Sequence, residues 1–366
     1  MHLTLYDLSY EQLAALLAEW GEPRFRAEQV WRWLYRSLAD DFAAMGNIPK
    51  ALRERLAAET HLHPLTPIAT QESADGLTRK VLFRLHDGQT IESVLMLYNR
   101  RRTVCVSTQV GCGMGCVFCA TGQSGLTRNL SSGEIVAQVL YFARQIRPQF
   151  PDRPITNLVL MGMGEPLANY RATRQAIATW TDARGFGLGA RRITLSTVGL
   201  VPGIRRLAEE EQPINLAVSL HAADDDLRNR LVPINRRYPL ADLMAAVRHY
   251  AGRTHRRVTV EYALIAGVND TPGQARRLAA LLHGLLCHVN LIPLNPTPGS
   301  SLRPSPRARV DAFRDALAQA GIPVTVRLRR GTEIEAGCGQ LRRREPGSCS
   351  TRISTGFTDG EPGVPV

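Results

Sequence analysis

Residues 103–119, Thr-Val-Cys-Val-Ser-Thr-Gln-Val-Gly-Cys-Gly-Met-Gly-Cys-Val-Phe-Cys, join an apolar, β-branched run to three closely spaced cysteines. The run from Val104 to Val110 predicts a buried strand. Cys112, Cys116 and Cys119 follow it directly, and the glycines between them let the backbone wrap closely around a bound group. The stretch therefore predicts a strand that ends in a metal or redox site.

Strand and helix patterns alternate along the rest of the chain. Strands are expected near 103–110, 157–163, 192–198, 214–220, 257–265, 289–294 and 323–328, and helices near 132–147, 171–182, 240–251, 272–286 and 306–320. This alternation is typical of an α/β fold with a parallel sheet, open or curled into a partial (β/α) barrel. Such folds bind ligands at the carboxyl ends of their strands.

The flanking segments predict smaller units. Residues 1–75 have amphipathic helical patterns, the first opened by a capping box at Ser9-Tyr10-Glu11-Gln12, and we expect a small basic helical domain. Residues 76–102 predict a β-hairpin linker around the turn His86-Asp87-Gly88. The core is expected over 103–345, and 346–366 is predicted to be a disordered tail.

Composition limits the class of protein. The chain has 366 residues, 44% of them hydrophobic, which excludes a wholly disordered or fibrous protein. It has no long apolar run and no recognisable export signal at its start, so we expect a cytoplasmic protein without a membrane span. The net charge of +12 favours a polyanionic partner such as nucleic acid. The Arg pairs 101–102, 236–237, 256–257 and 329–330 are candidate phosphate contacts, and the helical domain 1–75 is expected to help to bind RNA.

The three clustered cysteines favour iron over zinc. A structural zinc site normally takes four ligands in two halves, and no second half is visible in the sequence. Three thiolates suit a [4Fe-4S] cluster in which one iron stays open for a small molecule. A glycine-rich strand end, Met161-Gly162-Met163-Gly164-Glu165-Pro166, follows about 45 residues later. Together the two motifs resemble the radical S-adenosylmethionine enzymes.

Further motifs narrow this resemblance. They are Cys105-Val106-Ser107-Thr108-Gln109-Val110-Gly111-Cys112, Ser196-Thr197-Val198-Gly199, Ser219-Leu220-His221-Ala222, Leu231-Val232-Pro233, Asn290-Leu291-Ile292-Pro293-Leu294-Asn295-Pro296 and Ala336-Gly337-Cys338-Gly339-Gln340-Leu341. In this order they resemble the RlmN family from about Pro23 to Leu341. The resemblance implies a radical enzyme that methylates C2 of adenine in 23S ribosomal RNA and, in some members, in transfer RNA on the 3′ side of the anticodon.

The resemblance also implies cofactors and partners. One [4Fe-4S] cluster would be held by Cys112, Cys116 and Cys119, and two molecules of S-adenosylmethionine would be used per turnover. An electron donor such as flavodoxin or ferredoxin would reduce the cluster, and the enzyme would act as a monomer. The S-adenosylmethionine site would consist of Gly164, Glu165, Ser196, Ser219, Leu220, His221 and Asn295.

Three residues receive chemical roles from the same resemblance. Cys338 would carry the methyl group as S-methylcysteine, Cys105 would release the product through a transient disulfide with Cys338, and Glu92 would accept the C2 proton. Judged without the family, Cys105 would be a small core residue and Glu92 a solvated charge on a strand edge.

Three alternatives stay open. A Cfr-like enzyme with the same machinery would methylate C8 of adenine instead of C2. A zinc-containing RNA-binding module would need no catalysis. A radical enzyme acting on a small molecule would leave the basic charge and the pairing of Cys105 with Cys338 unexplained.

Overall fold

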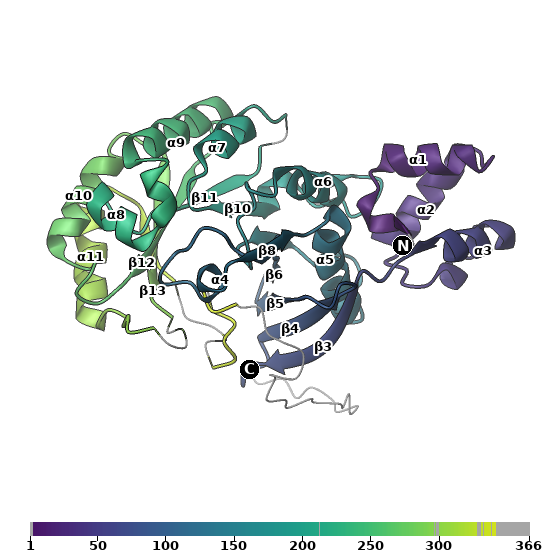
Figure 1. Ribbon diagram of the computed structural model, residues 1–366, viewed down its shortest axis with the longest axis horizontal. Helices are drawn as coiled ribbons and strands as arrows, with labels where there is room; N and C mark the ends of the chain where they lie inside the picture. The colour runs from purple at the N-terminus through teal and green to yellow at the C-terminus, as the bar shows by residue number, and fades with distance from the viewer. Residues whose placement is uncertain are drawn as a thin grey trace.

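A ten-stranded sheet runs through the molecule (Figure 1). The computed structural model describes residues 3–211, 213–295, 297, 300–327, 331, 333–337 and 339–341. From one edge to the other the strands are β14 (Val324–Val326), β13 (Cys287–Pro293), β12 (Val258–Leu264), β11 (Asn215–Ser219), β10 (Ile193–Thr197), β9 (Asn157–Leu160), β6 (Arg101–Cys105), β5 (Thr90–Tyr98), β4 (Thr78–Leu85) and β3 (Leu65–Glu72).

The sheet has a parallel part and an antiparallel part that meet at β6. Strands β6 and β9 to β14 are parallel to their neighbours, whereas β3, β4, β5 and β6 pair antiparallel. Among the described strands, β14 and β3 form the two edges and do not pair, so the sheet does not close. The predicted α/β class is confirmed, and the lack of closure agrees with the open sheet or partial barrel expected from the sequence.

Helices cover one face of this sheet (Figure 1). They are α5 (Ser132–Ile146), α6 (Tyr170–Thr181), α7 (Val201–Ala208), α9 (Leu240–Thr254), α10 (Pro272–Leu282) and α11 (Arg307–Gln319). On β4, Phe83 packs against Tyr141 and Phe142 of α5, with ring centroids 5.0 and 6.3 Å apart. The predicted capping box of Ser131 and Glu134 starts α5. Odd-numbered residues of β4 therefore face the helices, and even-numbered residues face the other side.

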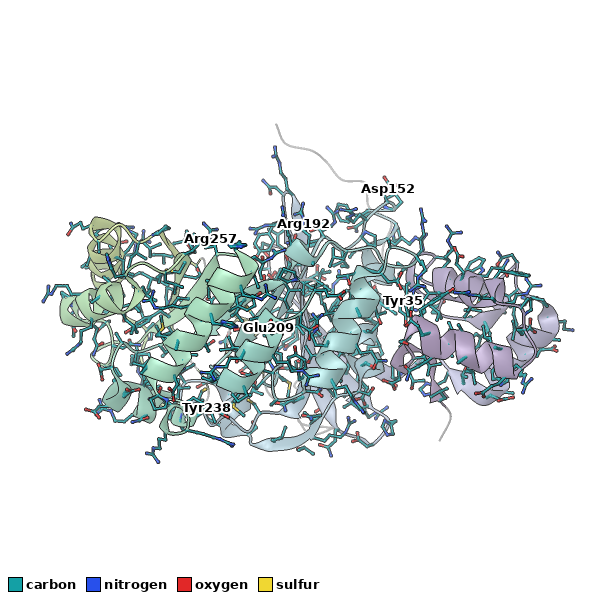
Figure 2. The ribbon with its side chains drawn as sticks, turned by 90° about the horizontal axis from the view of Figure 1, so that it is seen from above. Tyr35, Asp152, Arg192, Glu209, Tyr238 and Arg257 are labelled. Atoms are coloured by element: carbon teal, nitrogen blue, oxygen red, sulfur yellow. The ribbon has the colours of Figure 1, made fainter. Side chains whose placement is uncertain are left out.

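The carboxyl ends of the parallel strands lie along one long side of the molecule. Figure 2 shows Asp152, Arg192 and Arg257, which precede β9, β10 and β12, along one side, and Tyr238 along the opposite side. Tyr238 follows α8 (Asp225–Leu231), which begins after the end of β11. The predicted site residues therefore belong to the side marked by Tyr238.

The N-terminal helices α1 (Tyr10–Glu19), α2 (Phe25–Tyr35) and α3 (Lys50–Glu59) form a unit at one end of the molecule (Figure 1). The capping box at Ser9 is present. The unit docks on α5, because Asp7 Oδ1 accepts the Gly133 N–H at 2.6 Å and Arg144 donates to the carbonyl oxygens of Leu38 and Ala39. The Asp7 carboxylate thus lies at the positive end of the α5 dipole.

Several elements differ from those expected. Strand β3 was missed because Leu65–Glu72 contains Pro67 and lacks a continuous apolar pattern, as is common for an edge strand. The hairpin expected as a linker is continuous with the main sheet through β6. The run 103–110 splits into β6 and β7 (Gln109–Gly111), and β7 pairs with β8 (Leu126–Asn129). Residues 346–366 lie outside the described part, in which no helix is long and apolar enough to cross a bilayer.

Candidate active site

A cavity of about 1040 Å³, counting the solvent at its mouth, lies at the carboxyl ends of β9 to β13. Its lining includes all three predicted cluster cysteines and six of the seven predicted cofactor residues, namely Gly164, Glu165, Ser196, Ser219, His221 and Asn295. Leu220 is buried and is absent from the lining. The size suits a small-molecule cofactor, for which cavities of roughly 300–1000 Å³ are usual.

The cysteine loop is held by its own backbone. Cys112 donates its N–H to Gly125 O at 2.8 Å, and Cys119 donates to Cys116 O at 3.2 Å. Gly111 has a φ of +78°, and a Cβ there would lie 1.9 Å from Gly125 O, so only glycine fits. Burial raises the pKa of the Cys112 thiol to about 12. A metal centre would offset that cost, since it binds thiolates and displaces their protons.

The donor set fits a cluster better than a single ion. Of the five described cysteines, Cys105 and Cys287 do not line the cavity, which leaves three thiols there. Within the described ranges, no three His, Cys, Asp or Glu side chains are grouped as ligands of one metal ion. Three thiols that line one cavity instead suit a cluster, in which each thiolate binds a different iron.

Glu165 links the ends of two strands. Its Oε1 accepts the Leu167 N–H at 3.0 Å, and its Oε2 accepts the Val198 N–H at 2.9 Å. Burial raises the pKa of Glu165 to about 7. Beside it, Gly164 has a φ of +102°, and a Cβ there would lie 2.6 Å from Gln109 Cβ. Position 164 is therefore packed too closely against Gln109 for any side chain.

Arg228, which sequence reasoning missed, fixes the neighbouring strand ends. This buried guanidinium donates to Val198 O at 2.6 Å, to Leu220 O at 3.0 Å and to Ser219 O at 3.3 Å. It also donates to Asn235 Oδ1 at 2.6 Å. Leu220 thus has a backbone role behind the cavity wall. In the sequence, Arg228 stands in a charged stretch with Arg230 two residues later, and no pattern separates it from a surface charge.

His221 presents a neutral ring to the cavity. Its backbone is left-handed, with a φ of +61°, and its Nδ1 accepts the Ala263 N–H at 2.9 Å. The ring centroid lies 4.5 Å from that of Phe118 in the cysteine loop. Burial and, secondarily, the charge of Arg228 lower the pKa of His221 to about 3. The ring therefore carries one proton, on Nε2, across the physiological range.

A second group of predicted residues shares one face of the antiparallel strands. Val94 of β5 pairs with Lys80 of β4 and with Cys105 of β6, and Glu92 pairs with Leu82. Directly paired residues and their neighbours two positions away point to the same side of a sheet. Glu92, Cys105 and Lys80 therefore lie together on the face opposite α5. Glu92 is 1% exposed, so it is not a solvated edge charge.

This second group lies next to the glycine-rich strand end. The Glu92 N–H donates to Met163 Sδ at 3.3 Å, and Ser107 Oγ donates to Glu92 O at 2.6 Å. Ser107 Oγ also accepts the Met163 N–H at 2.8 Å. Neither Glu92 nor Cys105 lines the cavity itself. Met163, at the end of β9, thus connects the cavity region with the face that carries Glu92.

Described residues of the segment 331–341 contact both strand β4 and the cysteine loop of the cavity. A Cβ at Gly331 would lie 2.8 Å from Thr78 Cγ2 on β4, and Gly339 O accepts the Ala120 N–H at 2.8 Å. Gly339 and Leu341 line the cavity. Cys338 itself lies outside the described residues, as do Arg329 and Arg330 of the candidate phosphate contacts.

Of the other candidate phosphate contacts, Arg102 has a structural role. Its guanidinium donates to Pro154 O at 2.8 Å and to Arg153 O at 2.7 Å, and it stacks on Phe150. Arg101 is exposed and lies over the Tyr98 ring. Of this pair, Arg101 is the more exposed.

Comparisons with known proteins agree with this site. Residues 3–62 match the family described as "Ribosomal RNA large subunit methyltransferase N-terminal domain", and residues 106–279 match the radical SAM superfamily. A "Probable dual-specificity RNA methyltransferase RlmN" of Chloroflexus aurantiacus is 56% identical, over 93% of both chains. The "Dual-specificity RNA methyltransferase RlmN 1" of Myxococcus xanthus is 52% identical, over 92% of this chain and 94% of that one.

A solved structure agrees as well. The crystal structure of a radical SAM methyltransferase from Sphaerobacter thermophilus superposes with a TM-score of 0.91 at 55% identity. The match covers 93% of this chain and 99% of the other. With two cavity motifs in place and near-complete coverage at more than 50% identity, the chain belongs to the RlmN family of radical SAM RNA methyltransferases.

Proposed function

We propose that this chain methylates C2 of one adenine in 23S ribosomal RNA, and C2 of the adenine on the 3′ side of the anticodon in some transfer RNAs. The names of its relatives, which describe RNA methyltransferases of dual specificity, support two RNA substrates. The match of residues 3–62 to a large-subunit rRNA methyltransferase domain supports the ribosomal one.

Cys112, Cys116 and Cys119 would hold one [4Fe-4S] cluster, and S-adenosylmethionine would bind along Gly164, Glu165, Ser196, Ser219, His221 and Asn295. Once bound, these groups supply a methyl group from one cofactor molecule and a carbon-centred radical from a second. A reductant such as flavodoxin or ferredoxin delivers the electron, and the enzyme acts as a single chain.

The protein's own residues perform the remaining steps. Carbon C2 of adenine lacks a lone pair, so it cannot attack a sulfonium methyl, and the methyl group is first carried by the Cys338 sulfur. After the methylene carbon has bonded to C2, Glu92 takes the C2 proton, and the C–H electron pair stays on the purine ring. The unpaired electron of the adduct would return to the cluster as one-electron acceptor, which leaves a closed-shell adduct for release. Cys105 then attacks the Cys338 sulfur. The S–S bond forms, the S–CH₂ bond breaks, and its electron pair stays on the carbon, which gains a proton to become methyl.

One observation carries the proposal: Glu92 and Cys105 are both buried on one face of the β4–β5–β6 sheet, beside the glycine-rich strand end. Neither residue is needed to bind a cluster or S-adenosylmethionine. Both are needed if a protein–RNA adduct must lose a proton and then be released by a second thiol. Gly339, which follows Cys338 in the chain, lines the cavity.

The test uses anaerobically reconstituted protein and an rRNA fragment. Cys105→Ala is expected to accumulate a covalent protein–RNA adduct, whereas Cys338→Ala forms none. Cys287→Ala is the matched control, because Cys287 is a buried core thiol outside the cavity and should behave like wild type. Free methylated RNA from Cys338→Ala would contradict the carrier role.

The position of the methyl group needs a separate measurement. Digestion of the product and mass mapping of the modified adenine distinguish C2 from C8. A C8 product would refute the C2 assignment and favour the Cfr-like alternative.

A further inference from the structure

Lys80 and Glu92 form a buried ion pair. The Lys80 Nζ lies 3.3 Å from Glu92 Oε1, and the two side chains are 3% and 1% exposed. The chain contains only one other lysine, Lys50, whose side chain is 82% exposed. Removing two charges from water carries a large desolvation penalty, so such a pair is seldom explained by stability alone.

The strand register brings the pair to the proposed chemistry. Lys80 pairs with Val94, which is two residues from Glu92 on β5, so the two charged side chains are diagonal neighbours on one face. Cys105 pairs with the same Val94 from the other side. The ammonium, the carboxylate and the thiol therefore lie around one valine on the face opposite α5.

Lys80 also reaches the chain segment that leads to Cys338. Its Nζ donates to Glu335 O at 3.4 Å. The backbone of Gly331 packs closely against Thr78 of β4, since a Cβ at Gly331 would lie 2.8 Å from Thr78 Cγ2. One ammonium thus joins the carboxylate of β5 to the backbone of the segment 333–337.

Few titratable groups surround Glu92 among the described residues. Strand β4 presents Lys80 and, further along the same face, the exposed Arg84. Strand β6 presents the Cys105 thiol, and the segment 333–337 contributes Glu335. Strand β7 and Met163 present no charge. A buried carboxylate without a nearby cation tends to take up a proton, and a neutral acid cannot accept another.

We propose that Lys80 is a positioning residue for Glu92, which it holds ionised and in place to receive the C2 proton. This inference rests on the proposed function of Glu92. The ammonium does not touch the RNA. Its role is to make the ionised carboxylate the stable form in a site that excludes water, so that the proton passes from C2 to a carboxylate oxygen in a single step.

The test follows adduct decay in a single turnover at several pH values. Lys80→Met is expected to form the protein–RNA adduct normally but to resolve it at least about tenfold more slowly at pH 7, since the buried carboxylate loses the ammonium that lies 3.3 Å from it. Its rate profile should move to higher pH, so that the rate recovers at alkaline pH. Lys80→Arg keeps a cation and should stay near the wild-type profile. Lys50→Met is the matched control and should be unchanged.

Glu92→Gln separates the two claims. If it accumulates adduct at every pH, Glu92 is the proton acceptor, and the result for Lys80→Met then decides the role of Lys80. If it resolves adduct at the wild-type rate, the proposed function of Glu92 fails independently of Lys80. A Lys80→Met variant that resolves adduct like wild type at all pH values would overturn the inference.

A second measurement needs no variant at position 80. The full chain labelled with ¹⁵N at lysine Nζ should give two side-chain signals, and Lys50→Met removes one of them. The remaining signal is expected to be that of an ammonium at neutral pH. A neutral amine signal would overturn the inference, because the carboxylate would then lack its charged partner at 3.3 Å.

Discussion

Replacing Gly111 with alanine should destabilise the cluster loop severely. Gly111 has a φ of +78°, and a Cβ there would lie 1.9 Å from Gly125 O and 3.1 Å from Gly125 C. Both neighbours are backbone atoms, so no side-chain rotation relieves the overlap. The loop must move, and the bond from Cys112 N–H to Gly125 O, now 2.8 Å long, must break.

The magnitude follows from these two costs. A left-handed alanine costs about 1–2 kcal/mol relative to glycine. Loss of one backbone hydrogen bond adds about 1 kcal/mol. The sum of about 2–3 kcal/mol corresponds to a loss of roughly 30- to 150-fold in the population of the loop that presents its three thiols together.

The assay is retention of a reconstituted cluster against an iron chelator, followed by its visible absorbance. Gly111→Ala is expected to release iron at far lower chelator concentration than wild type. Gly113→Ala is the matched control in the same loop, because a Cβ there would meet only the Leu126 side chain, at 3.6 Å, an ordinary contact. If both variants held iron equally well, the argument from backbone overlap would be refuted.

Three further perturbations test other parts of the structure. Arg228→Met removes the hydrogen bonds to three strand-end carbonyl oxygens, so the free energy of unfolding should fall by about 3 kcal/mol. The thermal midpoint should then drop by roughly 4 °C. A drop of less than about 1 °C would contradict this role of Arg228. For Glu165, burial raises the pKa to about 7, so the unfolded chain releases this proton at lower pH than the folded protein. The apo-protein should therefore lose stability relative to Glu165→Gln as pH rises from about 4.5 to 7, and no further above 7; parallel stability curves would count against this. Arg144→Met removes the bonds to Leu38 O and Ala39 O and should speed amide hydrogen exchange in the N-terminal unit while iron content stays unchanged. Unchanged exchange there would show that this arginine does not hold the unit in place.

The parallel half of the fold was predictable because its signals are local. Apolar β-branched runs and capping boxes such as Ser131 with Glu134 mark elements from within a few residues. Strand β3 gave no such signal, since an edge strand with Pro67 need not be apolar. The β4–β5 hairpin joins the main sheet because β5 pairs with β6, and no local sequence pattern specifies that pairing.

The same distinction holds for the site. The cysteines of the cluster lie within eight residues, and the glycine-rich strand end lies within six, so spacing reveals both. Arg228 donates hydrogen bonds to carbonyl oxygens at two strand ends, and the residues around it in the sequence do not indicate these partners. Glu92 was assigned by resemblance alone, because its burial depends on Lys80 from another strand and on a segment some 240 residues away.

Strand β6 is where the two halves of the sheet meet, with β5 on one side and β9 on the other. Adding or deleting a single residue within Arg101–Cys105 would move each following side chain to the opposite face of the sheet, so the Cys105 thiol would point toward α5. The turn at His86–Gly88 faces no comparable demand. The number of residues in this five-residue strand thus decides whether the Cys105 thiol shares a face with Glu92.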